Sequence, residues 1–98
     1  GFTRGVAKDV AKYNILVNTV CIGSIKSGQG ERRVATMQQQ GTAMTMEAFY
    51  AEAGRNIPLG RVGEAREAGD VICFLASDRA SYLTGTSVNI DGGTSNVI

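Results

Sequence analysis

The stretch that decides the fold is residues 57–93, IPLGRVGEAREAGDVICFLASDRASYLTGTSVNIDGG. Four of its apolar residues recur at helical spacing: Ala68, Val71, Ile72 and Leu75. This spacing predicts a helix over residues 64–76. After a turn region, Val88 and Ile90 share one face of a predicted short strand over residues 86–90. The stretch therefore predicts a helix followed by a strand, closed by a turn at Asp91-Gly92-Gly93.

Upstream residues predict another helix and strand. Residues 2–13 place Phe2, Val6 and Val10 on one side of a helix, and Asn14 follows as a left-handed stop. Residues 15–21, ILVNTVC, are rich in strand formers with apolar groups on both faces. Such a strand is typical of a parallel sheet buried between helix layers. Within it, Asn18 requires hydrogen-bond partners, and we expect it to tie a loop to the strand.

The middle of the chain predicts a cover rather than a core. Residues 23–30 are rich in Gly and Ser and predict a loop. A weak helix is expected over residues 31–40, and Thr45 can cap a second one that ends near Ala53. Neither has a strong apolar stripe, so we expect both to form a mobile cover over the sheet.

The element order predicts an α/β fold with two parallel strands, two main helices and short covering helices. Two strands do not make a stable open sheet, so both are expected to pair with strands that this chain does not contain. No linker or repeat divides the sequence. We therefore expect residues 1–98 to form one incomplete domain.

Composition and charge exclude several classes of function. The 98 residues carry ten basic and nine acidic side chains, with no basic run, which argues against nucleic-acid binding. No apolar run approaches the roughly 20 residues of a membrane span. The chain has no His and no CxxC, so we expect no metal site. Cys21 and Cys73 lie in apolar runs and are expected to be buried and reduced, which favours a cytoplasmic location.

The order of these motifs resembles the carboxy-terminal portion of the short-chain dehydrogenase/reductase family, from residue 1 to about residue 93. The words that carry the likeness are Ile57-Pro58-Leu59-Gly60-Arg61, Phe74-Leu75-Ala76-Ser77-Asp78, Tyr82-Leu83-Thr84-Gly85 and Val88-Asn89-Ile90-Asp91-Gly92-Gly93, with Ile15–Val20 and Gly23 upstream. The resemblance implies part of a Rossmann-like doubly wound parallel sheet. It also implies that residues 28–56 form a substrate lid, in which Met37, Met44, Met46, Phe49 and Tyr50 either pack the lid down or line a pocket.

A cofactor-binding loop is expected at the carboxyl end of the first strand, where open α/β sheets bind ligands. Gly23 permits close backbone approach, and the hydroxyls of Ser24 and Ser27 can bond a carboxamide. In the family this loop holds the nicotinamide of NAD or NADP. The resemblance assigns the carboxamide contacts to the Ile25 backbone and the Ser27 hydroxyl. Ile22, where the family usually has Pro, would pack against the ring.

No catalytic residue is expected in this chain. The family's proton-transferring Tyr works with a Lys four residues later, which lowers its pKa. Tyr13, Tyr50 and Tyr82 are followed at that position by Val17, Gly54 and Thr86. The resemblance places the phosphate-binding glycines and the catalytic Ser, Tyr and Lys upstream of Gly1, so the 98 residues alone are expected to be inactive.

The resemblance implies an oxidoreductase that transfers a hydride between NAD or NADP and a small carbonyl or alcohol substrate. The family also forms homo-oligomers, through a helix such as residues 2–13 and through a helix and strand such as residues 64–76 and 86–90. A homotetramer or dimer is therefore expected. The alternative is a non-catalytic structural or oligomerisation module. The sequence does not indicate the substrate or the choice between NAD and NADP.

Overall fold

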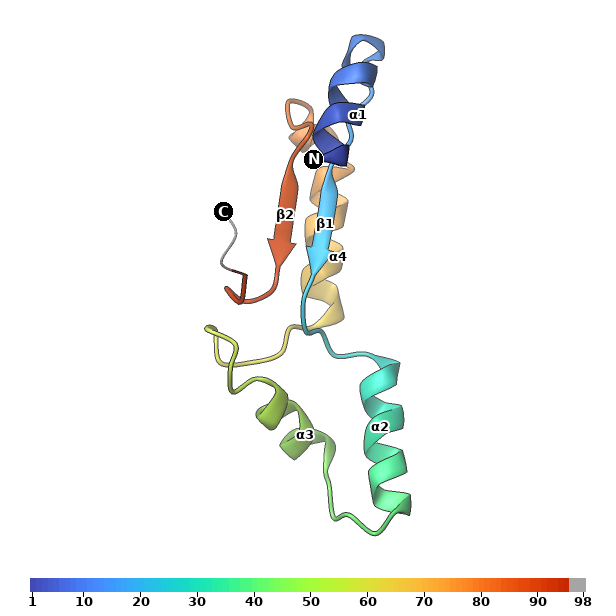
Figure 1. Cartoon of the computed structure of the whole chain (residues 1–98), viewed down its shortest axis with the longest axis vertical. Coiled ribbons are helices and arrows are strands. Elements are labelled where there is room, and N and C mark those ends of the chain that lie inside the picture. Colours follow the sequence, from blue (N-terminus) through green and yellow to red (C-terminus); the bar gives the residue numbers. More distant parts are fainter. Residues whose placement is uncertain (96–98) are drawn as a thin grey trace. The chain divides into compact units, whose positions relative to one another are not determined.

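The computed structural model describes residues 1–95, in which two strands are separated along the chain by helices (Figure 1). The elements are α1 (Phe2–Val10), the 3-10 helix η1 (Ala11–Tyr13), β1 (Thr19–Ile22), α2 (Gly28–Gln39), α3 (Met46–Ala53), α4 (Ala65–Leu75), the 3-10 helix η2 (Asp78–Ala80) and β2 (Ser87–Ile90). They group into two compact units. The first contains residues 1–22 and 66–90, and the second contains residues 23–65 and the segment that begins at Asp91.

The first unit contains a two-stranded parallel sheet, as Figure 1 shows by the matching directions of β1 and β2. Thr19 lies opposite Ser87, and Ile22 lies opposite Ile90. Along β2, the even positions Val88 and Ile90 are half-buried while the odd positions are exposed. The predicted α/β class, with parallel strands connected through helices, is confirmed.

The first strand is shorter than the prediction of residues 15–21. The ladder begins only at Thr19, because loop residues take the hydrogen bonds of the preceding segment. The Val17 N–H donates to Thr84 Oγ1 over 3.0 Å, and the Gly85 N–H donates to the Val17 carbonyl over 2.7 Å. The expected burial between two layers is also wrong. Ile15 and Leu16 are exposed, and β1 is half-buried or exposed along its length.

Asn18 ties the 83–86 loop to the start of β1, as predicted. Its Nδ2 donates to the Leu83 carbonyl over 3.1 Å, and its Oδ1 accepts from the Thr86 N–H over 3.0 Å. One side chain thereby fixes both the carbonyl and the amide of a turn that enters β2. Because Thr86 also accepts from the Thr19 N–H at 2.9 Å, Asn18 sets the point where the two strands begin to pair.

The helices of the first unit follow the predicted bounds closely. The predicted helix over residues 2–13 is α1 continued by η1, and Asn14 ends it in the left-handed conformation with φ 60°. Ala7 is buried, whereas Phe2 is 87% exposed, contrary to its expected place on the packed side. α4 ends where the Ser77 hydroxyl donates to the Phe74 carbonyl over 2.7 Å.

The buried apolar side chains among the described residues are small, and they come from both units: Ala7, Val34, Val62, Ala68 and Ala80. Cys21 and Cys73 are free and exposed, so their predicted burial is wrong. Each cysteine stands in an apolar run, but among the described residues the sheet consists of β1 and β2, and the carboxyl half of β1 is exposed. No helix in residues 1–95 is both long and apolar enough to cross a bilayer.

The predicted turn at Asp91 is confirmed in the second unit. The two carboxylate oxygens of Asp91 accept from the N–H groups of Gly93 and Ser95, at 3.0 and 2.9 Å. Gly92 has φ 62°, and a Cβ there would lie 2.6 Å from the Ile57 side chain. Its carbonyl accepts from the Leu59 N–H at 3.1 Å. Asp91 is therefore a turn residue, engaged locally, rather than an available acid.

Replacing Asn18 with Ala is expected to lower the free energy of unfolding of the 98-residue chain by about 1–3 kcal/mol, because the Thr86 N–H and the Leu83 carbonyl lose their partner. Urea titration followed by circular dichroism measures the change. The control is Asn89→Ala, since Asn89 is exposed on β2 and should cost little. Equal losses in the two variants would contradict the proposed tie.

Candidate functional site

The loop that leaves β1 is held by a backbone bridge to residues 62–64. The Gly63 N–H donates to the Ser24 carbonyl over 3.0 Å, and the Lys26 N–H donates to the Gly63 carbonyl over 2.9 Å. These two bonds make Ile25 and Gly63 a parallel bridge pair. The bridge holds an otherwise irregular loop in an extended conformation.

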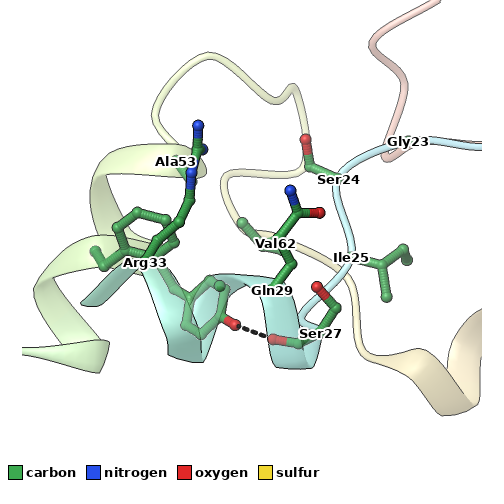
Figure 2. A pocket seen from close by; sticks show the side chains of 11 residues that line it. Gly23, Ser24, Ile25, Ser27, Gln29, Arg33, Ala53 and Val62 are labelled. Carbon is green, nitrogen blue, oxygen red and sulfur yellow. Dashed lines mark hydrogen bonds between the residues drawn. The ribbon is translucent and has the colours of Figure 1, made fainter. Parts of the chain in front are cut away.

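The bridge also orients the main chain of Ile25. In a parallel pairing, the bonds run from the residues on either side, so the N–H and C=O of the central residue face the opposite direction. Within residues 1–95, the main chain of Ile25 has no hydrogen-bond partner. Figure 2 shows the Ile25 side chain extending away from the helices. One donor and one acceptor are thus presented side by side at this position.

Ser27 is the residue just before α2, which begins at Gly28, three residues earlier than the predicted start at residue 31. Its extended backbone (φ −151°, ψ 168°) and its carbonyl, which accepts from the N–H groups of Gly30 and Glu31, start the helix within the predicted loop. The Ser27 hydroxyl makes no capping bond. It has no partner within residues 1–95, so it remains available to a ligand near the main chain of Ile25.

Tyr50 of α3 packs against the start of α2. Its hydroxyl lies 3.4 Å from the Ser27 carbonyl, and its ring meets Phe49 edge-on with centroids 5.4 Å apart. Gly30 makes this approach possible, because a Cβ there would lie 2.5 Å from Tyr50 Oη. The predicted cap of α3 is confirmed, since Thr45 Oγ1 accepts from the Ala48 N–H over 3.0 Å.

A pocket of about 420 Å³ lies among the loop, α2 and α3 (Figure 2). Its lining residues are Gly23, Ser24, Ile25, Ser27, Gln29, Gly30, Arg33, Phe49, Tyr50, Ala53 and Val62. The structure therefore brings together four of the five predicted cofactor-binding residues and two of the five predicted lid side chains. The fifth cofactor residue, Ile22, ends β1, is 52% exposed and does not line this pocket.

The three methionines of the predicted lid lie elsewhere. Met46 lines a second pocket of about 580 Å³ on the Lys26 side of the loop, and Met37 lines a third on α2. The carbonyl of Met44 accepts from Gln38 Nε2 over 2.7 Å, which fixes the turn between the helices. All three are half-buried. The lid over residues 28–56 and the five cofactor-binding assignments stay predictions.

Lys26 joins the loop to its two neighbours. Its Nζ lies 2.8 Å from Glu64 Oε1 and 5.4 Å from the centre of the Tyr50 ring. The hydrogen bond to Glu64, followed by the attraction of its charge, raises the pKa of Lys26 above its usual 10.5. Both side chains are exposed, so this ion pair orients the loop more than it stabilises the fold.

Gly30→Ala should stabilise α2 by about 0.5–1 kcal/mol only when Tyr50 is truncated, because Ala favours helix but collides with the Tyr50 hydroxyl. In the Tyr50→Ala variant, Gly30→Ala should therefore raise the free energy of unfolding. In the wild-type chain, where Tyr50 is present, the same substitution should leave it unchanged or lower it. Urea unfolding of the four proteins in this double-mutant cycle measures the coupling. Additive effects would show that Tyr50 does not occupy the space above Gly30.

Several pocket residues were not identified from the sequence: Gln29, Gly30, Arg33, Ala53 and Val62. Gln29 and Arg33 stand four residues apart, a spacing that puts two side chains on one helix face. That signal required the helix to begin at Gly28 rather than at residue 31. Val62 and Gly63 carried no signal, because their role arises from pairing with a loop nearly forty residues earlier. No group of His, Cys, Asp and Glu in residues 1–95 is arranged to bind a metal ion.

Comparison with known proteins gives extensive matches. A family model described as enoyl-(acyl carrier protein) reductase matches residues 1–95. The chain is 37% identical over 93 residues to the 3-oxoacyl-[acyl-carrier-protein] reductase FabG of Aquifex aeolicus, covering 95% of this chain and 33% of that protein. It is 39% identical over 93 residues to trans-4-hydroxycyclohexanecarboxylate dehydrogenase of Sinomonas cyclohexanicum, covering 95% of this chain and 29% of that protein.

Among solved structures, a similar fold occurs in the NADPH-bound short chain oxidoreductase with an atypical catalytic center from Pseudomonas aeruginosa PAO1. The TM-score is 0.80 at 35% identity, covering 99% of this chain and 35% of that one. This similarity confirms the prediction of part of a Rossmann-like sheet. The chain spans about a third of the length of the curated relatives it matches.

Proposed function

Because this chain belongs to the short-chain dehydrogenase/reductase family, we propose that it forms the nicotinamide-side part of an oxidoreductase. The reaction is hydride transfer between NAD or NADP and a carbonyl or alcohol carbon of a small substrate. The names of the two curated relatives refer to a 3-oxoacyl group and a hydroxycyclohexane, which supports this substrate class. Since the chain spans a third of these relatives, the activity is proposed for a longer protein that contains it.

The observation that carries the proposal is the polar edge of the 23–27 loop. The N–H and C=O of Ile25, which have no partner in the described part of the chain, match the acceptor and donor of a carboxamide. The Ser27 hydroxyl, which makes no capping bond, adds a third group. These groups fit the nicotinamide carboxamide of NAD or NADP. The NADPH-bound structure of a relative at 35% identity supports the same cofactor class.

The cofactor, when bound, supplies the hydride acceptor or donor. The residues of this chain bind and orient it. Ile25 and Ser27 would hold the carboxamide and thereby fix which face of the ring meets the substrate, and Ile22 would pack against the ring. Phe49 and Tyr50 provide an apolar wall beside the loop, from which water can be excluded when a ligand binds.

Proton transfer is assigned to no residue of this chain. Tyr50 is the tyrosine that lines the pocket, but no Lys follows it at the spacing the family uses, and its hydroxyl is directed to the Ser27 carbonyl. We propose that the catalytic Ser, Tyr and Lys belong to residues outside these 98. The chain alone is therefore expected to be inactive.

The parent protein is proposed to be a cytoplasmic homo-oligomer. The free thiols of Cys21 and Cys73 suit a reducing compartment. Ile72 and Phe74 on α4 are large apolar residues that remain exposed, and α4 corresponds to the predicted interface helix. A purely structural role is not favoured, because it gives no account of the polar edge at Ile25 and Ser27.

Titration of the isotope-labelled 98-residue chain with NADH tests the cofactor site. NADH should shift the amide signals of Ile25 and Ser27 with weak affinity, about 1 mM, because the adenine and phosphate sites are proposed to lie elsewhere. Ser27→Ala should weaken binding about three- to tenfold, through loss of one hydrogen bond. Nuclear magnetic resonance measures both effects.

Ser81→Ala is the matched control, since Ser81 is exposed on a turn of the first unit and should leave NADH binding unchanged. Shifts confined to other loops would overturn the assignment of the site. Micromolar affinity would instead contradict the view that most of the cofactor's binding energy comes from residues outside this chain.

Phe74→Asp should reduce the average mass of the associated species in multi-angle light scattering, because a charge on α4 opposes apolar association. Leu59→Asp is the control. Leu59 is 69% exposed but lies outside the predicted interface elements. An unchanged mass for Phe74→Asp, or an equal loss in both variants, would remove α4 from the interface.

A further inference from the structure

The pocket beside the 23–27 loop has one charged side chain among its described lining residues, Arg33. No carboxylate of residues 1–95 pairs with it, although other arginines of the chain do form ion pairs, such as Arg55 with Glu52 and Arg66 with Asp70. The remaining lining groups are hydroxyl, amide, glycine or apolar. The pocket therefore carries a positive charge that this part of the chain does not neutralise.

Gln29 lines the same pocket as Arg33. The two residues are four apart on α2, so their side chains share one face of the helix. Figure 2 shows the Gln29 amide and the Arg33 guanidinium extending from α2 in the same direction, with the Gln29 amide nearer to Ser24. The apolar side chains of Phe49 and Ala53 line the same pocket from α3. A polar corner thus adjoins an apolar wall.

A guanidinium has five donors and no acceptor, and its planar fork matches the two oxygens of a carboxylate. A neutral ligand that covered Arg33 would remove water from the cation without replacing the lost bonds, which is costly. A carboxylate would supply charge-assisted bonds instead. The chemistry of the pocket therefore favours an anionic ligand over a neutral one of the same shape.

We propose that this pocket selects substrates that bear a carboxylate, with Arg33 as the counter-ion and Gln29 as a second donor. This inference rests on the proposed function, in which the 23–27 loop holds the nicotinamide and the aromatic side chains of Phe49 and Tyr50 form an apolar wall beside it. It adds the substrate class: a small hydroxy or oxo acid whose carbon skeleton packs on Phe49 and whose carboxylate meets Arg33.

The phosphates of the cofactor are a second source of the same anionic chemistry. The lining favours the carboxylic acid, because an apolar wall accommodates a hydrocarbon skeleton and offers nothing to a diphosphate. Arg33 also belongs to the predicted substrate lid, residues 28–56. Titrations with a carboxylic acid and with NADH distinguish these two sources of negative charge.

The probes are trans-4-hydroxycyclohexanecarboxylate and the corresponding neutral carboxamide, each titrated into the labelled 98-residue chain and followed by amide shifts of residues 24–33. The wild-type chain should bind the carboxylate about tenfold more tightly than the carboxamide, the size expected for one charge-assisted contact. Arg33→Gln should abolish this preference. Arg33→Lys should keep part of it, because the charge remains and the planar fork is lost.

Arg32→Gln is the matched control. It removes the same charge from the adjacent position, but Arg32 is not among the residues that line the pocket beside the 23–27 loop and lines the neighbouring pocket on α2 instead. The preference should survive in this variant. Equal losses in Arg32→Gln and Arg33→Gln would overturn the proposal in favour of diffuse attraction, and equal wild-type affinity for the two probes would also overturn it.

An NADH titration of the same variants separates this proposal from the proposed function. If NADH shifts the amide signals of Ile25 and Ser27 while the chain binds the carboxylate and the carboxamide equally, the cofactor site stands and the substrate inference fails. If Arg33→Gln weakens the binding of NADH and leaves the binding of the carboxylate unchanged, Arg33 contacts the cofactor and the inference also fails. If the chain prefers the carboxylate but NADH shifts none of the loop signals, the role of Arg33 in carboxylate binding is supported and the cofactor assignment is wrong.

Discussion

The candidate site depends on one backbone interaction, the bridge between the loop after β1 and the residues before α4. By using the Ser24 carbonyl and the Lys26 N–H, Gly63 leaves the main chain of Ile25 turned outward, and neither of its polar groups finds a partner within residues 1–95. An irregular loop would otherwise satisfy such groups with water in many conformations. The bridge converts a flexible Gly- and Ser-rich segment into a fixed pair of hydrogen-bonding groups.

The same unit builds the rest of the pocket around that edge. Ser27 ends the extended segment and starts α2, so its hydroxyl stands next to Ile25 rather than capping the helix. Gly30 then admits the Tyr50 hydroxyl, which brings α3 and Phe49 beside the loop. A small residue in α2 thus determines where the aromatic wall lies. The pocket is polar on its loop side, apolar toward α3 and positive at Arg33.

In the first unit, hydrogen bonds from Val17 to the loop at residues 84–85 decide where the sheet begins. The strand-forming residues Ile15 and Leu16 remain outside the ladder, because Thr84 and Gly85 bind the neighbouring Val17. Strand propensity measures how well a side chain fits a pleated surface, so it cannot reveal which backbone partner is present. The same limitation explains the exposed cysteines, since an apolar run indicates suitability for burial but supplies no covering layer.

The sequence by itself determined the order of helices and strands, the Asn14 stop and the Asp91 turn, because each follows from periodicity or from bonds between near neighbours. It also indicated that Asn18 needs hydrogen-bond partners, but only the tertiary structure supplied them, because Leu83 and Thr86 are distant in sequence. Through its resemblance to the family it also predicted a cofactor-binding loop with five residues, namely Ile22, Gly23, Ser24, Ile25 and Ser27. Only the tertiary structure decided that Gly63 pairs with this loop, that α2 begins at Gly28 and that Arg33 lines the pocket. Those features depend on contacts between distant segments, whose geometry no local pattern encodes.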